Sequence, residues 1–127
     1  MREIEFKAKC QLKGKWMYGY YRVSGGKHYI NSTLIHPETL GQFTGKTVND
    51  DYYNGDDILV ETKQKIYEHD RVCYLKKEGG VGYGDICYDE EMCVFEIIDD
   101  DGDWQDLGDT YIIALAGNIH DMKRGEQ

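Results

Sequence analysis

The segment Gly41-Gln42-Phe43-Thr44-Gly45-Lys46-Thr47 contains the residue types of a phosphate-binding loop. Such a loop needs four residues between its glycines, so that successive N–H groups can surround a phosphate before a helix begins. Here three residues separate Gly41 from Gly45, and the next residues, Val48-Asn49-Asp50-Asp51, are acidic and loop-like. We therefore predict a tight glycine turn and no nucleotide chemistry.

Four aspartates surround Gly102 and carry the oxygen atoms that calcium prefers. They are Asp99, Asp100, Asp101 and Asp103. An EF-hand loop has glycine at its sixth position and glutamate at its twelfth. With Gly102 sixth, Ile97 is first and Gly108 is twelfth, so neither can be a ligand. Asp-Gly is also a strong hairpin dipeptide. We predict a solvated hairpin tip, with no metal and no other cofactor.

The cysteines, Cys10, Cys73, Cys87 and Cys93, include no C-x-x-C pair, the spacing that zinc and redox sites usually show. We expect buried free thiols, in preference to disulfides or to a zinc site built from Cys87, Cys93 and a histidine. No serine or cysteine lies in a recognisable nucleophile signature. We predict no catalytic residue and no enzyme, although paired carboxylates leave general acid–base chemistry as an alternative.

Aromatic side chains gather in the basic N-terminal part of the chain. The candidates for interaction are Trp16, Tyr18, Tyr20 and Tyr21. Lys13, Lys15, Arg22 and Lys27 lie among them in the sequence. Basic strands with exposed rings can bind single-stranded nucleic acid by stacking. We favour the alternative that one face of these strands is core and that the remaining tyrosines reflect β-propensity.

The dominant hydrophobic period along the chain is two, the period of a strand. Ile4, Phe6, Ala8 and Cys10 alternate with charged residues, which is typical of a strand with one buried face. Further strands are expected at residues 16–20, 29–35, 58–62, 66–75, 81–87, 92–98 and 111–116, the last buried on both faces. Glycine and acidic turns separate them at the spacing of a barrel or sandwich.

These elements predict a mainly-β fold of about eight short, mostly antiparallel strands. The fold is expected to be small, barrel-like and partly open, with little helix beyond one turn at Pro37. Residues 1–127 form one domain, in which a surface loop separates an N-terminal lobe, residues 1–46, from a C-terminal lobe, residues 55–121. The first residues contain no apolar signal segment, and no apolar run approaches the ~20 residues that span a bilayer. A cytoplasmic protein without membrane contact is expected.

Four collinear segments carry a family resemblance. They are Met1-Arg2-Glu3-Ile4-Glu5-Phe6-Lys7-Ala8, His36-Pro37-Glu38-Thr39-Leu40-Gly41-Gln42-Phe43-Thr44-Gly45, Tyr53-Asn54-Gly55-Asp56-Asp57-Ile58-Leu59 and Ala116-Gly117-Asn118-Ile119. Together they resemble the YopX family of bacteriophages and prophages of Gram-positive bacteria. Asn54 stands where the family usually has glutamate, and Asp57 resembles an insertion.

The resemblance implies a mainly-β phage or prophage protein of the host bacterial cytoplasm, and it carries no established activity. Its motifs suit structural turns, in which Gly41, Gly45, Gly55 and Gly117 stand where a side chain would clash. Asn118 follows the last of these glycines. Asp56 is expected to begin a strand and to accept hydrogen bonds from the preceding turn.

The net charge of −9 is unevenly distributed. Residues 1–46 carry 8 bases and 3 acids, whereas residues 78–127 carry 2 bases and 14 acids. This balance disfavours nucleic-acid binding by the whole surface, but not by a basic N-terminal patch. The acidic C-terminal half can dock on a basic protein or on the basic half of another copy. Its alternative role is to keep the protein in solution.

Two functions are therefore considered. In the first, a non-enzymatic phage accessory protein binds a host or phage protein through its acidic C-terminal half, and self-association as a homo-oligomer is compatible with this role. In the second, a small β-barrel associates with nucleic acid through its basic aromatic N-terminal strands. We favour the first.

Overall fold

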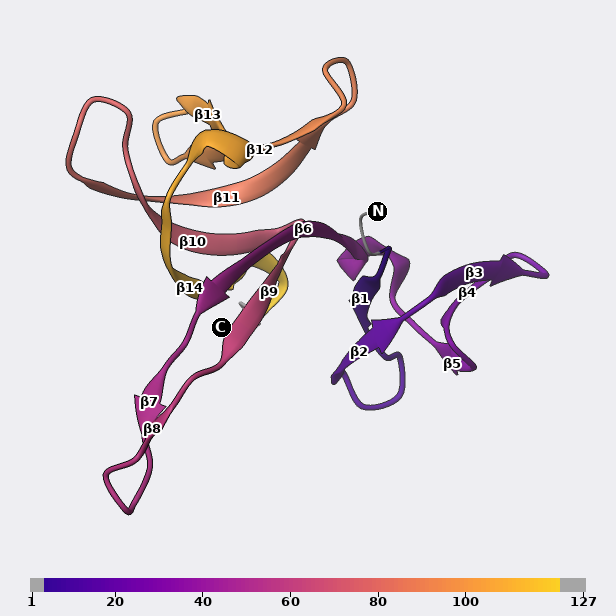
Figure 1. Cartoon of the computed structure of the whole chain (residues 1–127). Coiled ribbons are helices and arrows are strands. Elements are labelled where there is room, and N and C mark those ends of the chain that lie inside the picture. The colour runs from indigo at the N-terminus through magenta and orange to yellow at the C-terminus, as the bar shows by residue number, and fades with distance from the viewer. Residues whose placement is uncertain (1–3, 122–127) are drawn as a thin grey trace.

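The computed structural model describes residues 4–121, and Figure 1 traces the chain through them. The mainly-β prediction is confirmed. The strands are β1 (Phe6–Lys9), β2 (Trp16–Gly19), β3 (Tyr21–Ser24), β4 (Lys27–Ile30), β5 (Thr33–Leu34), β6 (Gly41–Asn49), β7 (Tyr52–Tyr53), β8 (Leu59–Val60), β9 (Lys63–Tyr67), β10 (Asp70–Leu75), β11 (Val81–Asp89), β12 (Val94–Asp99), β13 (Trp104–Asp106) and β14 (Ile112–Asn118). The 3-10 turns are η1 (Pro37–Thr39), η2 (Leu107–Asp109) and η3 (Ile119–Asp121). Met1–Glu3 of the first family-like segment lies outside the described residues.

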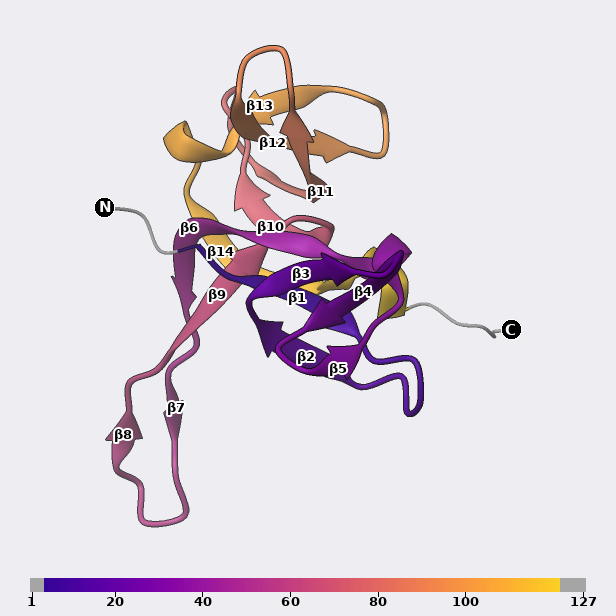
Figure 2. The same cartoon turned by 90° about the vertical axis from the view of Figure 1, so that its right-hand side faces the viewer.

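Antiparallel pairing builds the whole fold. One sheet has the order β2-β1-β6-β9, and a second has the order β13-β12-β11-β10-β14. The five-stranded sheet curls into part of a barrel, with β13 and β14 as its open edges (Figure 1). The strands β3-β4-β5 form a small third sheet, which lies beside β1 and β2 (Figure 2). Residues 4–121 contain no helix with the length and hydropathy of a membrane-spanning segment.

Buried apolar side chains form two clusters. The C-terminal cluster consists of Val48, Ile66, Val72, Tyr74, Ile86, Phe95, Ile97, Leu107 and Ile112, with Leu115 packed against it. The N-terminal cluster consists of Ala8, Ile30 and Ile35, with Phe6, Met17, Tyr21 and Leu40 packed against it. The strand β6 runs from one cluster to the other, because it begins after Leu40 and carries Val48 near its end.

The glycine-rich segment expected as a tight turn belongs to β6 instead. Gly41 pairs with Lys7 of β1, and Phe43 pairs with Tyr67 of β9. The register with β9 shifts between Phe43 and Thr47, and Gly45 has a φ of 90° within that shift. The glycine thus allows an irregularity inside a strand that continues to Asn49, which is why the turn prediction was wrong.

The single strand expected over residues 66–75 is two strands, β9 and β10, joined by a turn at Glu68 and His69. His69 has a φ of 77°. The turn is closed by the Asp70 carboxylate, whose Oδ2 accepts a hydrogen bond from the Tyr67 N–H at 2.8 Å. No glycine or proline marks this reversal, so the apolar pattern continues across it. The segment 29–35 is likewise divided into β4 and β5, at Asn31 with a φ of 56°.

The last strand, β14, is less buried than predicted. Ile112 and Asn118 are buried at its two ends, whereas the strand between them is largely open to solvent. The reason is topological, because β14 is an edge strand that pairs with β10 alone among the described strands. An apolar run therefore did not indicate burial on both faces.

A two-stranded arm leaves the body between β6 and β9 (Figure 1). We define the arm as residues 50–62, closed at its base by a hydrogen bond from Asp50 N to Thr62 O at 2.9 Å. Its only strands are β7 and β8, which pair with each other. At its tip, Asn54 Oδ1 accepts hydrogen bonds from the N–H groups of Asp56 and Ile58. Asn54 is thus the acceptor, and the prediction that Asp56 accepts these bonds and begins a strand was wrong.

Candidate functional site

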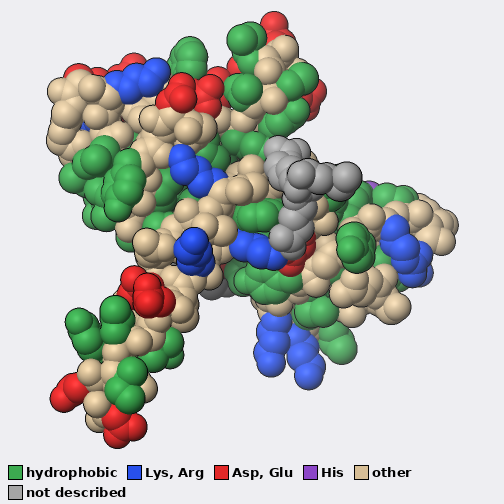
Figure 3. Space-filling view, in the orientation of Figure 1, with side chains coloured by type: hydrophobic (Ala, Val, Ile, Leu, Met, Phe, Trp, Pro, Cys, Tyr) green, Lys and Arg blue, Asp and Glu red, His purple; other side chains and the backbone are tan. Residues whose placement is uncertain are grey.

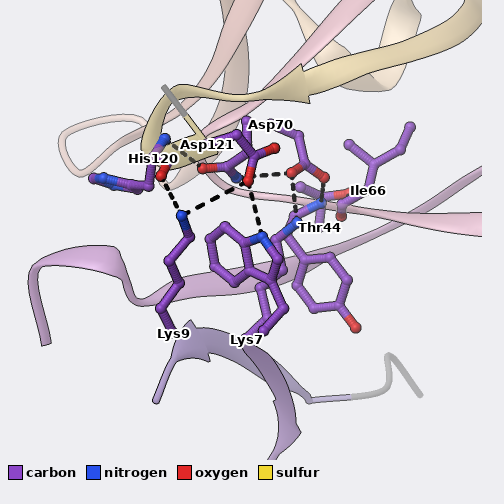
Figure 4. A network of polar contacts seen from close by, with 10 residues as sticks. Lys7, Lys9, Thr44, Ile66, Asp70, His120 and Asp121 are labelled. Atoms are coloured by element: carbon purple, nitrogen blue, oxygen red, sulfur yellow. Dashed lines mark hydrogen bonds and ion pairs between the residues drawn. The ribbon is translucent and has the colours of Figure 1, made fainter. Parts of the chain in front are cut away.

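A buried ionic network joins the N-terminal strands to the C-terminal ones (Figure 4). Lys7 Nζ donates a hydrogen bond to Asp70 Oδ1 at 2.7 Å, and the side chains of the two residues are 11% and 3% exposed. Asn118 Nδ2 donates to the same oxygen at 2.9 Å, and the Tyr67 N–H donates to Oδ2. Both carboxylate oxygens therefore have donors, which is what a buried charge requires.

Neither Lys7 nor Asp70 was expected at a buried site. The alternation of β1 assigned the Lys7 face to solvent, but that face is covered by the turn between β9 and β10. An aspartate inside an otherwise strand-forming stretch was the available signal, because charged side chains are rare in strand interiors unless they are paired.

Trp16 contacts this network and the C-terminal end of the described chain. Its Nε1 donates a hydrogen bond to Asp121 Oδ1 at 2.9 Å, and its ring lies 4.6 Å from Lys7 Nζ and 5.4 Å from Lys9 Nζ. Lys9 Nζ also donates to the His120 carbonyl oxygen (Figure 4). Trp16 thus contacts the C-terminal end of the described chain rather than presenting its ring to a ligand.

The other three aromatic candidates point in different directions. Tyr18 packs against Tyr67 with a ring separation of 5.7 Å, and burial together with the nearby Asp70 charge raises its pKa. Tyr21 belongs to the N-terminal cluster and stacks on His28. Tyr20 is 75% exposed. The structure therefore assigns most of the predicted stacking surface to internal contacts and leaves Tyr20 and one side of Tyr18 open.

Two of the family-like segments meet at the turn between β9 and β10. A Cβ on Gly41 would collide with the Glu68 carbonyl oxygen, so only glycine fits there. On the other side, Asn118 holds Asp70, and the Ile119 N–H donates to the His69 carbonyl at 3.0 Å. Residues far apart in the sequence thus fix one turn.

The remaining family-like glycines have different surroundings. Gly117, with a φ of 117°, has a backbone conformation that favours glycine. Gly55 lies at the arm tip, where an added Cβ would meet nothing within 4 Å. The expected clash at Gly55 is therefore absent.

The five-stranded sheet has a solvent-facing side that we call the outer face. It consists of Arg71, Cys73 and Leu75 on β10 with their partners Asp85, Tyr83 and Val81 on β11. Leu75 is 45% exposed, Tyr83 is 53% exposed and Val81 is 55% exposed. The opposite side of these strands carries Val72, Tyr74 and Ile86 of the C-terminal cluster. The outer face is thus an apolar strip that no other described element covers.

The acidic hairpin tip lies at one end of this sheet. Asp99 Oδ1 accepts hydrogen bonds from Asp101 N and Asp103 N, both at 2.9 Å, so Asp99 shapes the turn. Asp100 forms an ion pair with Arg71 at 3.0 Å, and this bond, with the Asp85 charge, raises the Arg71 pKa. Asp101 and Asp103 remain exposed. The predicted hairpin tip is present, and its aspartates have distinct roles.

A cleft of about 370 Å³ separates this tip from the turn between β10 and β11. Lys76 and Lys77 line one side, and Asp101 and Asp103 line the other. The Lys77 ammonium lies 6.0 Å from the centre of the Trp104 ring. Figure 3 shows acidic and basic side chains next to each other at this end of the molecule. The acidic surface is therefore edged by two lysines.

Side chains that could take part in chemistry are dispersed over the fold. Lys46 donates to the carbonyls of Leu107 and Thr110, and burial lowers the pKa of its ammonium group. All four cysteines are free, but only Cys10 is buried, so the prediction of four buried thiols was wrong. Within residues 4–121, no three His, Cys, Asp or Glu side chains are grouped so that they could hold a metal ion.

Comparisons of the chain with known protein families, with curated proteins and with solved structures find no match.

Proposed function

We propose that the chain is a phage or prophage accessory protein of the YopX family that binds a host or phage protein in the host bacterial cytoplasm and is not an enzyme. Its binding surface is the outer face together with the acidic hairpin tip. The observation that carries this proposal is the exposed apolar strip formed by Leu75, Val81 and Tyr83 on a sheet whose other side is core. The family and the location rest on the resemblance of four sequence segments.

The chemistry of the outer face suits a protein partner. An apolar centre with a polar rim is the usual anatomy of a protein interface, and exposed tyrosine is prominent among residues that dominate binding energy. Asp100 lies at the rim, where it pairs with Arg71, whereas Asp101 and Asp103 line the cleft beside Lys76 and Lys77. We expect the complementary surface to be basic where it meets the hairpin tip and apolar at its centre. Such complementarity accelerates association at low salt.

A double variant of the outer face, compared with a control variant elsewhere on the surface, tests this proposal. The double variant V81S/Y83S removes two exposed side chains without touching the C-terminal cluster. Tyr20→Ser is a matched control, because Tyr20 is 75% exposed and lies between β2 and β3, away from the outer face. The immobilised chain is exposed to lysate of a Gram-positive host, and retained proteins are purified and titrated calorimetrically.

The double variant should raise the dissociation constant at least tenfold, since truncation of an interface tyrosine commonly costs more than about 1 kcal/mol. The control should leave the dissociation constant within about twofold of the wild-type value. A partner that binds the double variant and the wild type equally would refute the proposal. So would a folded wild-type chain that retains no protein at low salt.

A second candidate function has one observation in its favour. Lys13, Lys15, Arg22 and Lys27 take part in no ion pair within the described part of the chain, and Tyr20, which is close to them in the sequence, is 75% exposed. This patch could bind single-stranded nucleic acid by stacking. A gel-shift series against rising salt decides between the two, because phosphate contacts weaken steeply with salt. No shift at low salt would exclude this function.

A further inference from the structure

The arm exposes apolar side chains that the body of the molecule does not cover. Tyr52 is 54% exposed, Tyr53 is 70% exposed, Ile58 is 59% exposed and Leu59 is 47% exposed. They lie on a two-stranded ribbon that projects from the body in both views (Figures 1 and 2). A hairpin alone is marginally stable in water, and a projecting apolar ribbon is a common form of interaction site.

The arm is also strongly acidic. Its acids are Asp50, Asp51, Asp56, Asp57 and Glu61, and it contains no lysine or arginine. Asp50 and Asp51 accept hydrogen bonds from Gln64 and Thr62, so they stabilise the base of the arm. Asp56 and Glu61 are exposed. Figure 3 shows red and green side chains interleaved along the arm. Its partner must therefore be both apolar and basic.

A surface with these properties exists on the N-terminal part of the same chain. A hollow of about 620 Å³ is lined by Gln11, Leu12, Tyr29, Ser32, Thr33 and Leu34. Leu12 at its edge is 89% exposed. Lys13 follows Leu12 in the sequence, and the Arg22 guanidinium lies 4.4 Å from the centre of the Tyr29 ring. The hollow thus combines apolar walls with cations that have no acidic partner among the described residues.

We propose that the arm of one copy docks in this basic hollow of a second copy. The arm projects away from β5, so it does not fill the hollow of its own chain (Figure 1). The arm and the turn between β1 and β2 both extend toward the lower end of the molecule, but from different sides of the body (Figure 2). Two copies can exchange arms about a two-fold axis, with both hollows filled and the opposite charges paired. This surface is separate from the outer face, so the inference goes beyond the proposed function.

The first experiment measures mass by sedimentation of the full chain. The wild type should sediment with a mass above that of one 14.7 kDa chain. The variant Y53S/L59S, which removes apolar contacts from the arm, should sediment as a single chain. Met92→Ser is the matched control, because Met92 is 69% exposed at the turn between β11 and β12, and it should behave as the wild type.

The second experiment exchanges charges. D56K/E61K replaces two exposed acids of the arm with lysine, and K13E/R22E replaces two cations beside the hollow with glutamate. Each variant alone should sediment as a single chain, because its substituted side chains meet like charges in both docking contacts. An equimolar mixture should recover the wild-type mass, because each arm then meets a hollow of opposite charge. Circular dichroism of each variant verifies its fold, and the recovery in the mixture cannot come from misfolded chains.

Three outcomes would overturn the inference. One is a wild type that sediments as a single chain at all concentrations. Another is an oligomer that survives both the arm variant and the charge reversals. The third is a mixture that fails to associate when each variant is folded. V81S/Y83S should keep the wild-type mass, which separates this inference from the proposed function.

Discussion

Lys7 and Asp70 form a buried ion pair at 2.7 Å although 63 positions separate them in the sequence. The pair lies where β1 meets the turn between β9 and β10, between the two apolar clusters. Asn118 completes it from the end of β14. This ion pair is the buried member of the set of polar contacts, with those of Lys9 and Trp16, that joins the basic N-terminal strands to the C-terminal part of the chain. The first prediction concerns its energy.

Asp70→Ala should destabilise the protein by about 3–5 kcal/mol, because it leaves the Lys7 ammonium buried without a counter-charge. The neighbouring surface pair supplies the control. Arg71→Ala breaks the ion pair with Asp100, which is 77% exposed at its side chain, and should cost less than about 1 kcal/mol. Urea unfolding measures both changes. Equal losses in the two variants would contradict the importance of the buried pair.

Gly41→Ala should destabilise the protein by roughly 1–3 kcal/mol, because the added methyl group meets the Glu68 carbonyl and the turn must move. Gly55→Ala is the contrasting substitution. Its methyl group has no neighbour within 4 Å, so stability should stay within about 0.5 kcal/mol of the wild type. Thermal unfolding distinguishes the two, and a larger loss at Gly55 would show that the tip is more constrained than its surroundings suggest.

Stability should fall with acidification because of His120. Burial lowers the pKa of its imidazole, with further lowering from His69 and Lys9 that outweighs the opposite influence of Glu38 and Asp121. The unfolded state therefore binds a proton at higher pH than the folded state, and stability is lost as the pH falls through the unfolded pKa, about 6.5.

His120→Gln tests this prediction. Unfolding is compared at about pH 7.5 and about pH 5.5, a window that spans the unfolded histidine pKa. The variant should lose less stability than the wild type between these two conditions. The other histidines are present in both proteins, so the difference reports on His120. An equal loss in both proteins would assign the pH dependence to other groups.

Asp99→Ala should weaken the hairpin tip by about 0.5–1.5 kcal/mol, because two backbone N–H groups lose their acceptor. Asp101→Ala removes an exposed charge at the same tip and should change stability by less than about 0.5 kcal/mol. Denaturant unfolding measures both. An Asp101 variant that is equally destabilised would mean that the tip carboxylates act together rather than through Asp99.

The sequence predicted the elements whose boundaries are marked by turn residues. The hairpin at Asp101-Gly102, the single turn at Pro37 and the strand over residues 92–98 all have clear local signals. The reversal at His69 has none, because its turn is closed by the Asp70 side chain and not by glycine or proline. Local patterns cannot contain this information, since it depends on contacts across the fold.

The residue types of the candidate site could be predicted from the sequence, but the positions of its aromatic residues relative to one another could not. The acidic tip lies where the Asp-Gly dipeptide indicated. The aromatic candidates lie apart in the structure, because Trp16 contacts Asp121 of η3 while Tyr21 packs against the N-terminal cluster. Alternation along one strand assigns two faces, but it does not say what covers each face.

The buried pair also limits how this chain can vary by genetic exchange. A crossover between positions 7 and 70 keeps the ion pair only when the parent that supplies position 7 encodes lysine there and the parent that supplies position 70 encodes aspartate. A recombinant that receives only one of these two residues has a buried charge without its partner. The basic N-terminal portion and the acidic C-terminal portion must therefore be inherited with matching residues at positions 7 and 70, although their different charges resemble those of two separate modules.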